Sequence, residues 1–483
     1  MRLRPIQLLT AIAGVIVLLL LSLYAIMIRQ PSPRVSIASV SSGVRSLTLS
    51  FSIEAPQKAN VTVEVVPVGC GDEEPKRLEM QGVEPREGVI SSELRFDVKG
   101  GCGYRVRVEA SIGHRKSSAE EFEPYVRAFD DLAAELAEKG LVISASYMPW
   151  NMAEVLGSSW QRDKPLLGFY DAADDFVQWK HIDWARGHGI YLFWVDWTNY
   201  ASTPVVDRLV KVTQGLLDKG MAVGIMIGPQ VGMASEEGYP SINLGYEQNS
   251  AILLSVIQKA VPLLNHPNYY RVEGRPAILI WNEAAFYNRA EAYRRLKELV
   301  KSACGAEPYL IADALPRISR RGPLNPLSTE GGWYLRNILG RSDGGDRYID
   351  AYTSWVGFLS VQGPEALTPE TLAQYSVWYR EHLEQWASLL RASGKRIVPT
   401  VSPGFDRTHD PTFNQSFPIA RDRARLIETL MVAVQTVGGR GEVRVDTWND
   451  FFEGTYVEPS EAEGFEMLSA LKQALSELLA SKR

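Results

Sequence analysis

The hydrophobic positions of this chain follow three different patterns in turn. The first is a continuous apolar run over residues 6–28 that contains no charged residue. As a helix rising about 1.5 Å per residue, this run is long enough to cross the hydrocarbon core of a membrane, which is about 30 Å thick. A cleaved signal peptide has a shorter apolar region and a small-residue cleavage site, and no such site is clear before Arg29. The pattern favours an uncleaved, single-pass membrane anchor over residues 1–30, with the rest of the chain on the extracellular side of the cell membrane.

The second pattern, over residues 31–124, is an alternation of apolar and polar residues in short runs. SLTLSFSI (46–53) and NVTVEVVPV (60–68) are examples, and glycine, proline and charged clusters separate the runs. Such alternation is typical of strands with one buried face. It predicts a small all-β sandwich that resembles immunoglobulin or fibronectin type III domains in pattern only, with a role as a spacer or binding module.

Two cysteines stand at turn-like ends of strands in this predicted sandwich. Cys70 lies in PVGCGDEE and Cys102 in KGGCGYRV. Outside the cell such a pair suggests a disulfide. The alternative is two unpaired thiols in loops.

The third pattern, over residues 125–483, alternates apolar runs of strand length with helical stretches. NSAILLSVIQKAVPLL (249–264) has helical spacing of its apolar residues, and Thr368 followed by Pro369 is a helix start signal. This organisation predicts an α/β domain with a (β/α)8 TIM barrel. A doubly wound open sheet is the alternative, but no glycine-rich dinucleotide fingerprint follows any strand. The eight predicted strands are residues 142–147, 190–196, 222–228, 277–281, 309–313, 348–353, 396–401 and 442–448.

Composition and charge narrow the choice of partner. The 483 residues have a net charge of −6, and no run of Lys or Arg could follow a phosphate backbone. Nucleic acid is therefore a poor candidate partner. The six histidines are scattered without metal-ligand spacing, so neither a metal nor another cofactor is predicted.

The residues just beyond the predicted strands are mostly aromatic or acidic. In a (β/α)8 enzyme this end of the strands carries the active site. Aromatic rings and acids suit a carbohydrate cleft, because a sugar has both an apolar face and a polar rim. The alternative, that Trp simply fills the core, fits the tryptophans within helix patterns better than those at strand ends. The predicted substrate-binding residues are Tyr147, Trp150, Asp196, Trp197, Glu283, Asp313, Tyr352, Asp406, Trp448 and Asn449.

Two carboxylates follow the eighth strand within RVDTWNDFFEGTYVEPS (444–460), namely Asp450 and Glu453. Glycosidic cleavage needs one carboxylic acid to protonate the leaving oxygen and a second carboxylate as base or nucleophile. On spacing alone such a pair is a weak signal, but its position after a strand strengthens it.

The residues around this pair resemble known enzyme motifs. WNDFFEGTYVEP (448–459) is similar to the N-E-W-H-E-G-T-x-I-E-P motif of glycoside hydrolase family 99, the endo-α-mannosidases and endo-α-mannanases, and to the W-N-D-Y-G-E motif of the family 71 α-1,3-glucanases. HPNYYRVEGRPAILIW (266–281) and IVPTVSPGFDRT (397–408) also resemble family 99 stretches, in the same order.

The resemblance implies roles for individual residues. Glu453 matches the general acid/base, and Trp197 matches an aromatic residue in the substrate cleft. Asp450 matches the carboxylate that deprotonates the sugar's own 2-hydroxyl in family 99 and serves as a base in family 71. The chain departs from family 99 by having Asp at 450, and by having MIGPQ (226–230) where that family has H-I-E-P-Y. These departures put specificity for mannose in doubt.

Together these features predict a membrane-anchored, extracellular glycoside hydrolase that cuts an α-linked polysaccharide or glycan internally. One alternative is a non-catalytic carbohydrate-binding or cell-envelope surface protein built on the same barrel. Another is a role in glycan assembly, although no nucleotide-sugar site is visible in the sequence.

Overall fold

A computed structural model describes the chain in two compact units, residues 1–129 and 130–483. The sequence placed this division near residue 124, which lies within the last strand of the first unit, β7 (Arg115–Val126). The described residues are 16–17, 32–70, 73–157, 160–198, 203–237, 241–315, 318, 343–356, 368–413, 415 and 417–481.

The predicted membrane anchor, residues 6–28, lies outside the described residues apart from Ile16 and Val17. Among the residues that the structure describes, no helix is both long enough and apolar enough to cross a membrane.

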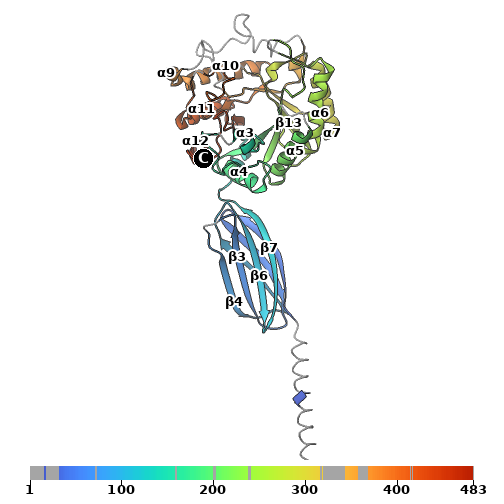
Figure 1. Ribbon diagram of the computed structural model, residues 1–483, viewed down its shortest axis with the longest axis vertical. Coiled ribbons are helices and arrows are strands. Elements are labelled where there is room, and N and C mark those ends of the chain that lie inside the picture. The colour runs from blue at the N-terminus through green and yellow to red at the C-terminus, as the bar shows by residue number, and fades with distance from the viewer. Residues whose placement is uncertain are drawn as a thin grey trace, which may run out of the picture. The chain divides into compact units, whose positions relative to one another are not determined.

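The first unit consists of two antiparallel sheets, as the alternating pattern predicted (Figure 1). Alternate residues of both sheets face one shared core, for example Leu49 and Phe51 from one sheet and Val63 and Val108 from the other. The three-stranded sheet has the order β1 (Arg34–Gly43), β2 (Ser46–Glu54), β5 (Val89–Asp97), and the four-stranded sheet has the order β4 (Lys76–Val83), β3 (Ala59–Val68), β6 (Cys102–Ile112), β7.

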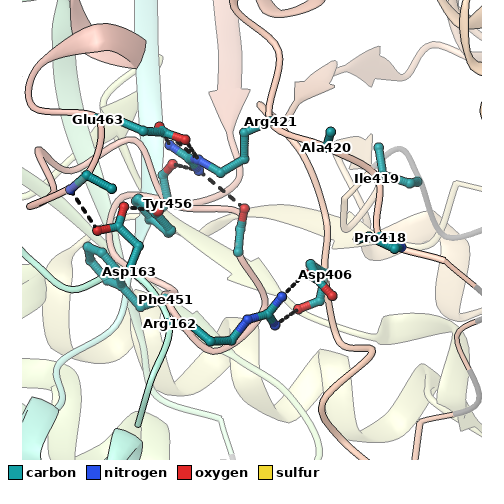
Figure 2. A pocket seen from close by; sticks show the side chains of 12 residues that line it. Arg162, Asp163, Asp406, Pro418, Ile419, Ala420, Arg421, Phe451, Tyr456 and Glu463 are labelled. Atoms are coloured by element: carbon teal, nitrogen blue, oxygen red, sulfur yellow. Dashed lines mark hydrogen bonds and ion pairs between the residues drawn. The ribbon is translucent and has the colours of Figure 1, made fainter.

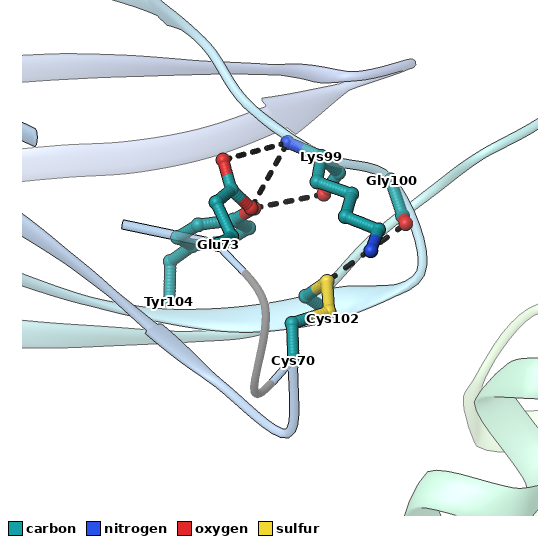
Figure 3. The surroundings of a disulfide bond; sticks show 6 residues. All are labelled: Cys70, Glu73, Lys99, Gly100, Cys102 and Tyr104. Atoms are coloured by element: carbon teal, nitrogen blue, oxygen red, sulfur yellow. Dashed lines mark hydrogen bonds between the residues drawn. A yellow bond between two sulfur atoms is a disulfide. The ribbon is translucent and has the colours of Figure 1, made fainter. Parts of the chain in front are cut away.

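The disulfide between Cys70 and Cys102 is confirmed, with the two Cα atoms 5.8 Å apart (Figure 3). It joins the segment after β3 to the first residue of β6. Beside it, the Tyr104 hydroxyl lies 2.9 Å from the Lys99 carbonyl oxygen and also contacts the Glu73 carboxylate.

The second unit is built on a curled parallel sheet whose strands match the eight predicted runs closely. The sheet order is β17 (Arg396–Ile397), β16 (Ala351–Thr353), β15 (Tyr309–Asp313), β13 (Arg275–Ile280), β10 (Ala222–Ile227), β9 (Ile190–Asp196), β8 (Leu141–Tyr147), β19 (Gly441–Val445), β18 (Thr400–Val401), with β12 (Arg271–Val272) pairing antiparallel to β13.

The two ends of this sheet are pieces of one predicted strand, residues 396–401. Its first half bonds to β16, with Val398 N donating to Tyr352 O at 2.8 Å, and its second half bonds to β19, with Arg444 N donating to Pro399 O at 2.9 Å. Pro399 has no N–H to donate, which explains why the strand is divided there. The sheet therefore curls back on itself, consistent with the predicted TIM barrel.

The interior of the curled sheet is packed with side chains from alternate strand positions, including Leu192, Trp194 and Leu279. Gly224 on β10 makes room for the Trp194 indole, because a Cβ at residue 224 would lie 2.3 Å from a ring carbon. The indole nitrogen donates to Glu442 at 2.6 Å. Glycine is needed inside this strand because the Trp194 ring lies close to the backbone of residue 224, and not because the chain turns there.

The helices form an outer layer around the strands of the second unit (Figure 1). The helix start at Thr368 and Pro369 is confirmed, and the residues that follow form two helices, α9 (Pro369–Leu372) and α10 (Tyr375–Ala392). Two short strands, β11 (Ile242–Asn243) and β14 (Phe286–Tyr287), and two 3-10 turns, η1 (Glu283–Ala285) and η2 (Gly345–Tyr348), lie in the connections. The helices are α2 (Leu132–Glu138), α3 (Met152–Leu156), α4 (Asp175–Gly187), α5 (Thr203–Asp218), α6 (Glu247–Leu264), α7 (Ala290–Cys304), α9 (Pro369–Leu372), α10 (Tyr375–Ala392), α11 (Arg423–Thr436) and α12 (Glu466–Ser481).

Candidate active site

The loop after β19 is a rigid turn that fixes the positions of Asp450 and Glu453. Thr447 N donates to Thr455 O at 2.8 Å, which closes the base of the loop. Inside it, Asp450 N donates to Thr447 Oγ1 at 2.9 Å, and Asp450 Oδ1 accepts from Glu453 N at 2.8 Å. Asp450 thus orders the turn that carries Glu453, so the two carboxyl groups are positioned together.

Among the residues that the structure describes, the Glu453 carboxyl group has only long contacts to side chains. Its Oε1 lies 3.4 Å from Arg407 Nη1, and its Oε2 lies 3.4 Å from Trp355 Nε1. Glu453 is partly exposed, whereas Asp450 is buried. Glu453 is therefore the more accessible of the two acids.

Burial raises the pKa of both acids well above the ordinary carboxylic range. The negative charge of Asp450 adds to the rise in the pKa of Glu453, while Arg407 lowers both pKa values. Asp450 is nonetheless the deeper of the two residues. Asp450 still ionises first, since its carboxylate accepts backbone N–H groups and its charge holds the proton on Glu453.

Two further acids, Asp196 and Asp313, lie at the carboxyl ends of β9 and β15. Burial raises the pKa of each to about 6. Asp196 also raises the pKa of Asp450, so these two carboxyl groups are close enough to interact. Four acids that hold their protons more tightly than usual therefore gather at one end of the curled sheet, and such clusters are typical of catalytic sites.

A cavity of about 290 Å³ lies behind the Asp450–Glu453 loop (Figure 2). Phe451 and Gly454 of the loop line it, but neither catalytic candidate does. The predicted site residue Asp406 is on its wall, in an ion pair with Arg162. Asp406 N also donates to the Glu453 carbonyl oxygen at 2.7 Å, so the loop after the seventh predicted strand helps to hold the Asp450–Glu453 loop.

Four predicted substrate-binding residues are core residues instead. Tyr147, Trp197, Trp448 and Asn449 are fully buried. The Tyr147 hydroxyl lies 3.1 Å from His181 Nδ1, Trp197 Nε1 donates to Thr213 at 3.1 Å, and the Asn449 side chain bonds to both backbone groups of Met148. All four side chains are buried, so they offer no surface to a sugar.

Glu283 and Tyr352 are also corrected from substrate contacts to structural residues. Glu283 is fully buried, and its Oε1 accepts from Arg289 at 2.5 Å and from Tyr293 at 2.9 Å. The Tyr352 hydroxyl donates to Asp346, which is bonded to the same Arg289. Trp150 is partly exposed near the start of α3, and its predicted contact with substrate stays a prediction.

The sequence did not single out Arg407, although it follows Asp406 in a motif that resembles family 99. Trp355 and Trp281 are partly exposed and meet edge to face, with ring centroids 5.8 Å apart. Trp355 contacts Glu453 directly. Their positions just beyond strands were the available signal, but the sequence could not show which tryptophans stay accessible.

Comparisons with known proteins agree with this architecture. A family model described as Glycosyltransferase WbsX matches residues 242–471. The solved GH99 endo-α-mannosidase from Bacteroides thetaiotaomicron is 16% identical over 73% of this chain and 99% of that chain, with a TM-score of 0.48.

Two further solved structures extend the comparison. A second structure of the same enzyme gives 17% identity, 73% and 99% coverage and a TM-score of 0.49. A structure described as a glycoside hydrolase-like protein gives 18% identity, 69% and 93% coverage and a TM-score of 0.52. At these identities the likeness is one of fold. No curated protein sequence matches this chain.

Proposed function

We propose that the second unit is a (β/α)8 glycoside hydrolase that cuts an α-linked polysaccharide or glycan internally. The observation that carries the proposal is the pair Asp450 and Glu453, held by one turn at the carboxyl end of the strands with raised pKa values. Glycosidases need an acid that stays protonated near neutral pH beside a carboxylate that does not. Electrostatic coupling between Asp450 and Glu453 supports this difference, because the charge of Asp450 raises the pKa of Glu453.

In this proposal Glu453 donates its proton to the leaving glycosidic oxygen, and Asp450 acts as the base. The ionised Asp450 carboxylate accepts the Glu453 backbone N–H at 2.8 Å. Glu453 has no contact shorter than 3.4 Å to Arg407 or Trp355, so its carboxyl group is available to a substrate oxygen. The exposed parts of Trp281 and Trp355 offer aromatic faces for a sugar ring.

The cellular location is part of the same proposal. The apolar run 6–28 supports an anchored protein whose folded units act on an extracellular glycan. Fractionation of cells that produce the full chain should place it with membranes, and external protease should digest it in intact cells. Recovery of a freely soluble protein that begins near residue 30 would contradict the anchor.

The hydrolase is tested by incubating the full chain with a panel of α-mannans and α-glucans and analysing the products for released oligosaccharides. Asp450→Asn should abolish release. Glu461→Gln is the matched control, because Glu461 is an exposed acid beyond the same loop and should leave the rate unchanged. No oligosaccharide from any α-linked glycan would contradict the hydrolase.

The family description favours a second candidate, glycosyl transfer. The matched span, residues 242–471, contains the whole Asp450–Glu453 loop. In this case the same carboxylate pair would act on a donor sugar, and the product would be a longer glycan rather than shorter ones. Incubation with nucleotide-activated sugars and an acceptor oligosaccharide separates the two candidates by the direction of the change in chain length.

A non-catalytic binding protein is the third candidate. Its support is that eight of the ten predicted substrate contacts are buried. Glycan binding that is retained in wild type, with neither release nor transfer, would select it.

A further inference from the structure

The amino-terminal end of the curled sheet contains a second cavity, of about 810 Å³. The first residues of several strands line it, including Val142 of β8, Tyr309 of β15 and Glu442 of β19. The strands run parallel, so this cavity lies at the opposite end from Asp196 and Asp313. Its volume is in the range of about 300 to 1,000 Å³ that small-molecule sites occupy.

The mouth of this cavity is strongly basic, although the whole chain has a net charge of −6. Arg391 and Arg440 are exposed, and within the described part of the chain neither guanidinium has an ion-pair or hydrogen-bond partner. An arginine in this state is available to bind a carboxylate or a phosphate through two parallel hydrogen bonds. The charged residues that line the cavity are the basic Arg271, Arg391, Lys395, Arg396 and Arg440 and the acidic Glu273 and Glu442.

The remaining basic residues add to the positive potential. Arg271 donates to the carbonyl oxygens of Leu264 at 2.7 Å and Gly274 at 3.2 Å, and neither acceptor cancels its charge. Arg396 is paired with Glu273. The mouth of the cavity therefore keeps an excess of positive charge. The concave shape focuses the resulting positive potential into the cavity.

Glu442 lies on the floor of the cavity, where protein side chains, including Tyr270, already bond to its carboxyl group. Glu442 is 6% exposed, and its Oε1 accepts from Ser144 at 2.7 Å and from Trp194 at 2.6 Å. Burial raises the pKa of Glu442, which favours its neutral form and weakens its repulsion of an anion. Tyr270 and Tyr309 add aromatic surface to the lining. An apolar ring face with hydroxyls at its edge fits such a surface.

We propose that this amino-terminal cavity binds a saccharide that carries a phosphate or a carboxylate. Arg391 and Arg440 bind the anionic group, and the sugar ring enters between the tyrosines toward Glu442. The site is separate from the Asp450–Glu453 pair, and the proposal does not depend on whether that pair hydrolyses or transfers sugars.

Isothermal titration of the full chain with glucose 6-phosphate and with glucuronic acid tests the proposal. Wild type should bind at least one of them, and the double variant Arg391→Ser with Arg440→Ser should weaken this binding by about tenfold or more, because two charge-assisted contacts are lost. Arg294→Ser with Arg347→Ser is the matched control, since both arginines are exposed and outside the cavity. The control should bind like wild type.

The two probes distinguish a phosphate site from a carboxylate site, and preference for either supports the proposal. The proposal would be overturned if neither anionic sugar bound wild type, if the double variant bound as tightly as wild type, or if neutral glucose bound as tightly as the anionic sugars. Inorganic phosphate and glucose 6-phosphate should differ in affinity, and equal affinity would reject a saccharide as the ligand.

Discussion

Glu453 and Glu283 both stand in loops that directly follow parallel strands, and the sequence predicted a role in the site for each. The structure gives them opposite surroundings. Glu283 is fully buried and held by Arg289 and Tyr293 at 2.5 and 2.9 Å. Glu453 is partly exposed, has contacts of 3.4 Å to Arg407 and Trp355, and has a raised pKa. A carboxylate with a close cationic partner stabilises the fold, whereas one without it can give and take a proton.

The largest expected effect comes from Glu453→Gln, which removes the proposed acid without removing a close ion pair. Turnover of an α-linked polysaccharide should fall by about 10²- to 10⁴-fold, the usual contribution of general acid catalysis. A substrate with an activated leaving group should recover part of the rate, because it needs less protonation. Full activity in the variant would show that Glu453 resembles Glu283 in having no chemical role.

The second-largest effect concerns the ion pairs around the buried Glu283, and it is an effect on stability. Arg289→Gln leaves Glu283, Asp343 and Asp346 without their shared cation, so the free energy of unfolding should fall by about 3 to 5 kcal/mol. Urea denaturation measures this. Arg294→Gln on the exposed face of α7 is the control and should cost about 1 kcal/mol or less. Similar losses of unfolding free energy in the two variants would contradict a stabilising role for the ion pairs of Arg289.

A smaller effect is the dependence of stability on pH. The folded-state pKa of Glu453 is raised, so its stabilising contribution is present below its ordinary value and is lost as pH rises through the raised value. The free energy of unfolding of Glu453→Gln should therefore improve relative to wild type between about pH 5 and about pH 8. A constant difference across that window would mean that the Glu453 pKa is ordinary.

The smallest effect is expected at Arg407, whose charge lowers the pKa of both catalytic candidates. Arg407→Gln should shift the pH profile of kcat/KM toward higher pH, because Asp450 then ionises later and Glu453 keeps its proton longer. Arg407→Lys keeps the charge and should keep the profile close to that of wild type. A shift of the profile toward lower pH in Arg407→Gln would contradict the proposal that Arg407 lowers the two pKa values.

The sequence predicted the strands of the second unit well because each is an apolar run, and it predicted the disulfide because both cysteines stood at strand ends. The position of Asp450 and Glu453 after the last strand was likewise predictable. The side chains that contact the carboxylates could not be predicted. Arg289 lies six residues from Glu283 and Asp343 lies fifty-four from Arg289, so their meeting depends on tertiary structure. For the same reason, nothing local distinguished the buried Trp197 and Trp448 from the accessible Trp281 and Trp355.

The fit between Gly224 and Trp194 also constrains how this protein can change over evolutionary time. A side chain at residue 224 would overlap the indole, so the glycine can be replaced without damage only after Trp194 has become smaller. The reverse order of substitutions passes through an overpacked intermediate. Since Trp194 also donates to Glu442 on the floor of the amino-terminal cavity, its replacement alters that cavity first. A lineage that varies residue 224 should therefore already have remodelled the cavity floor.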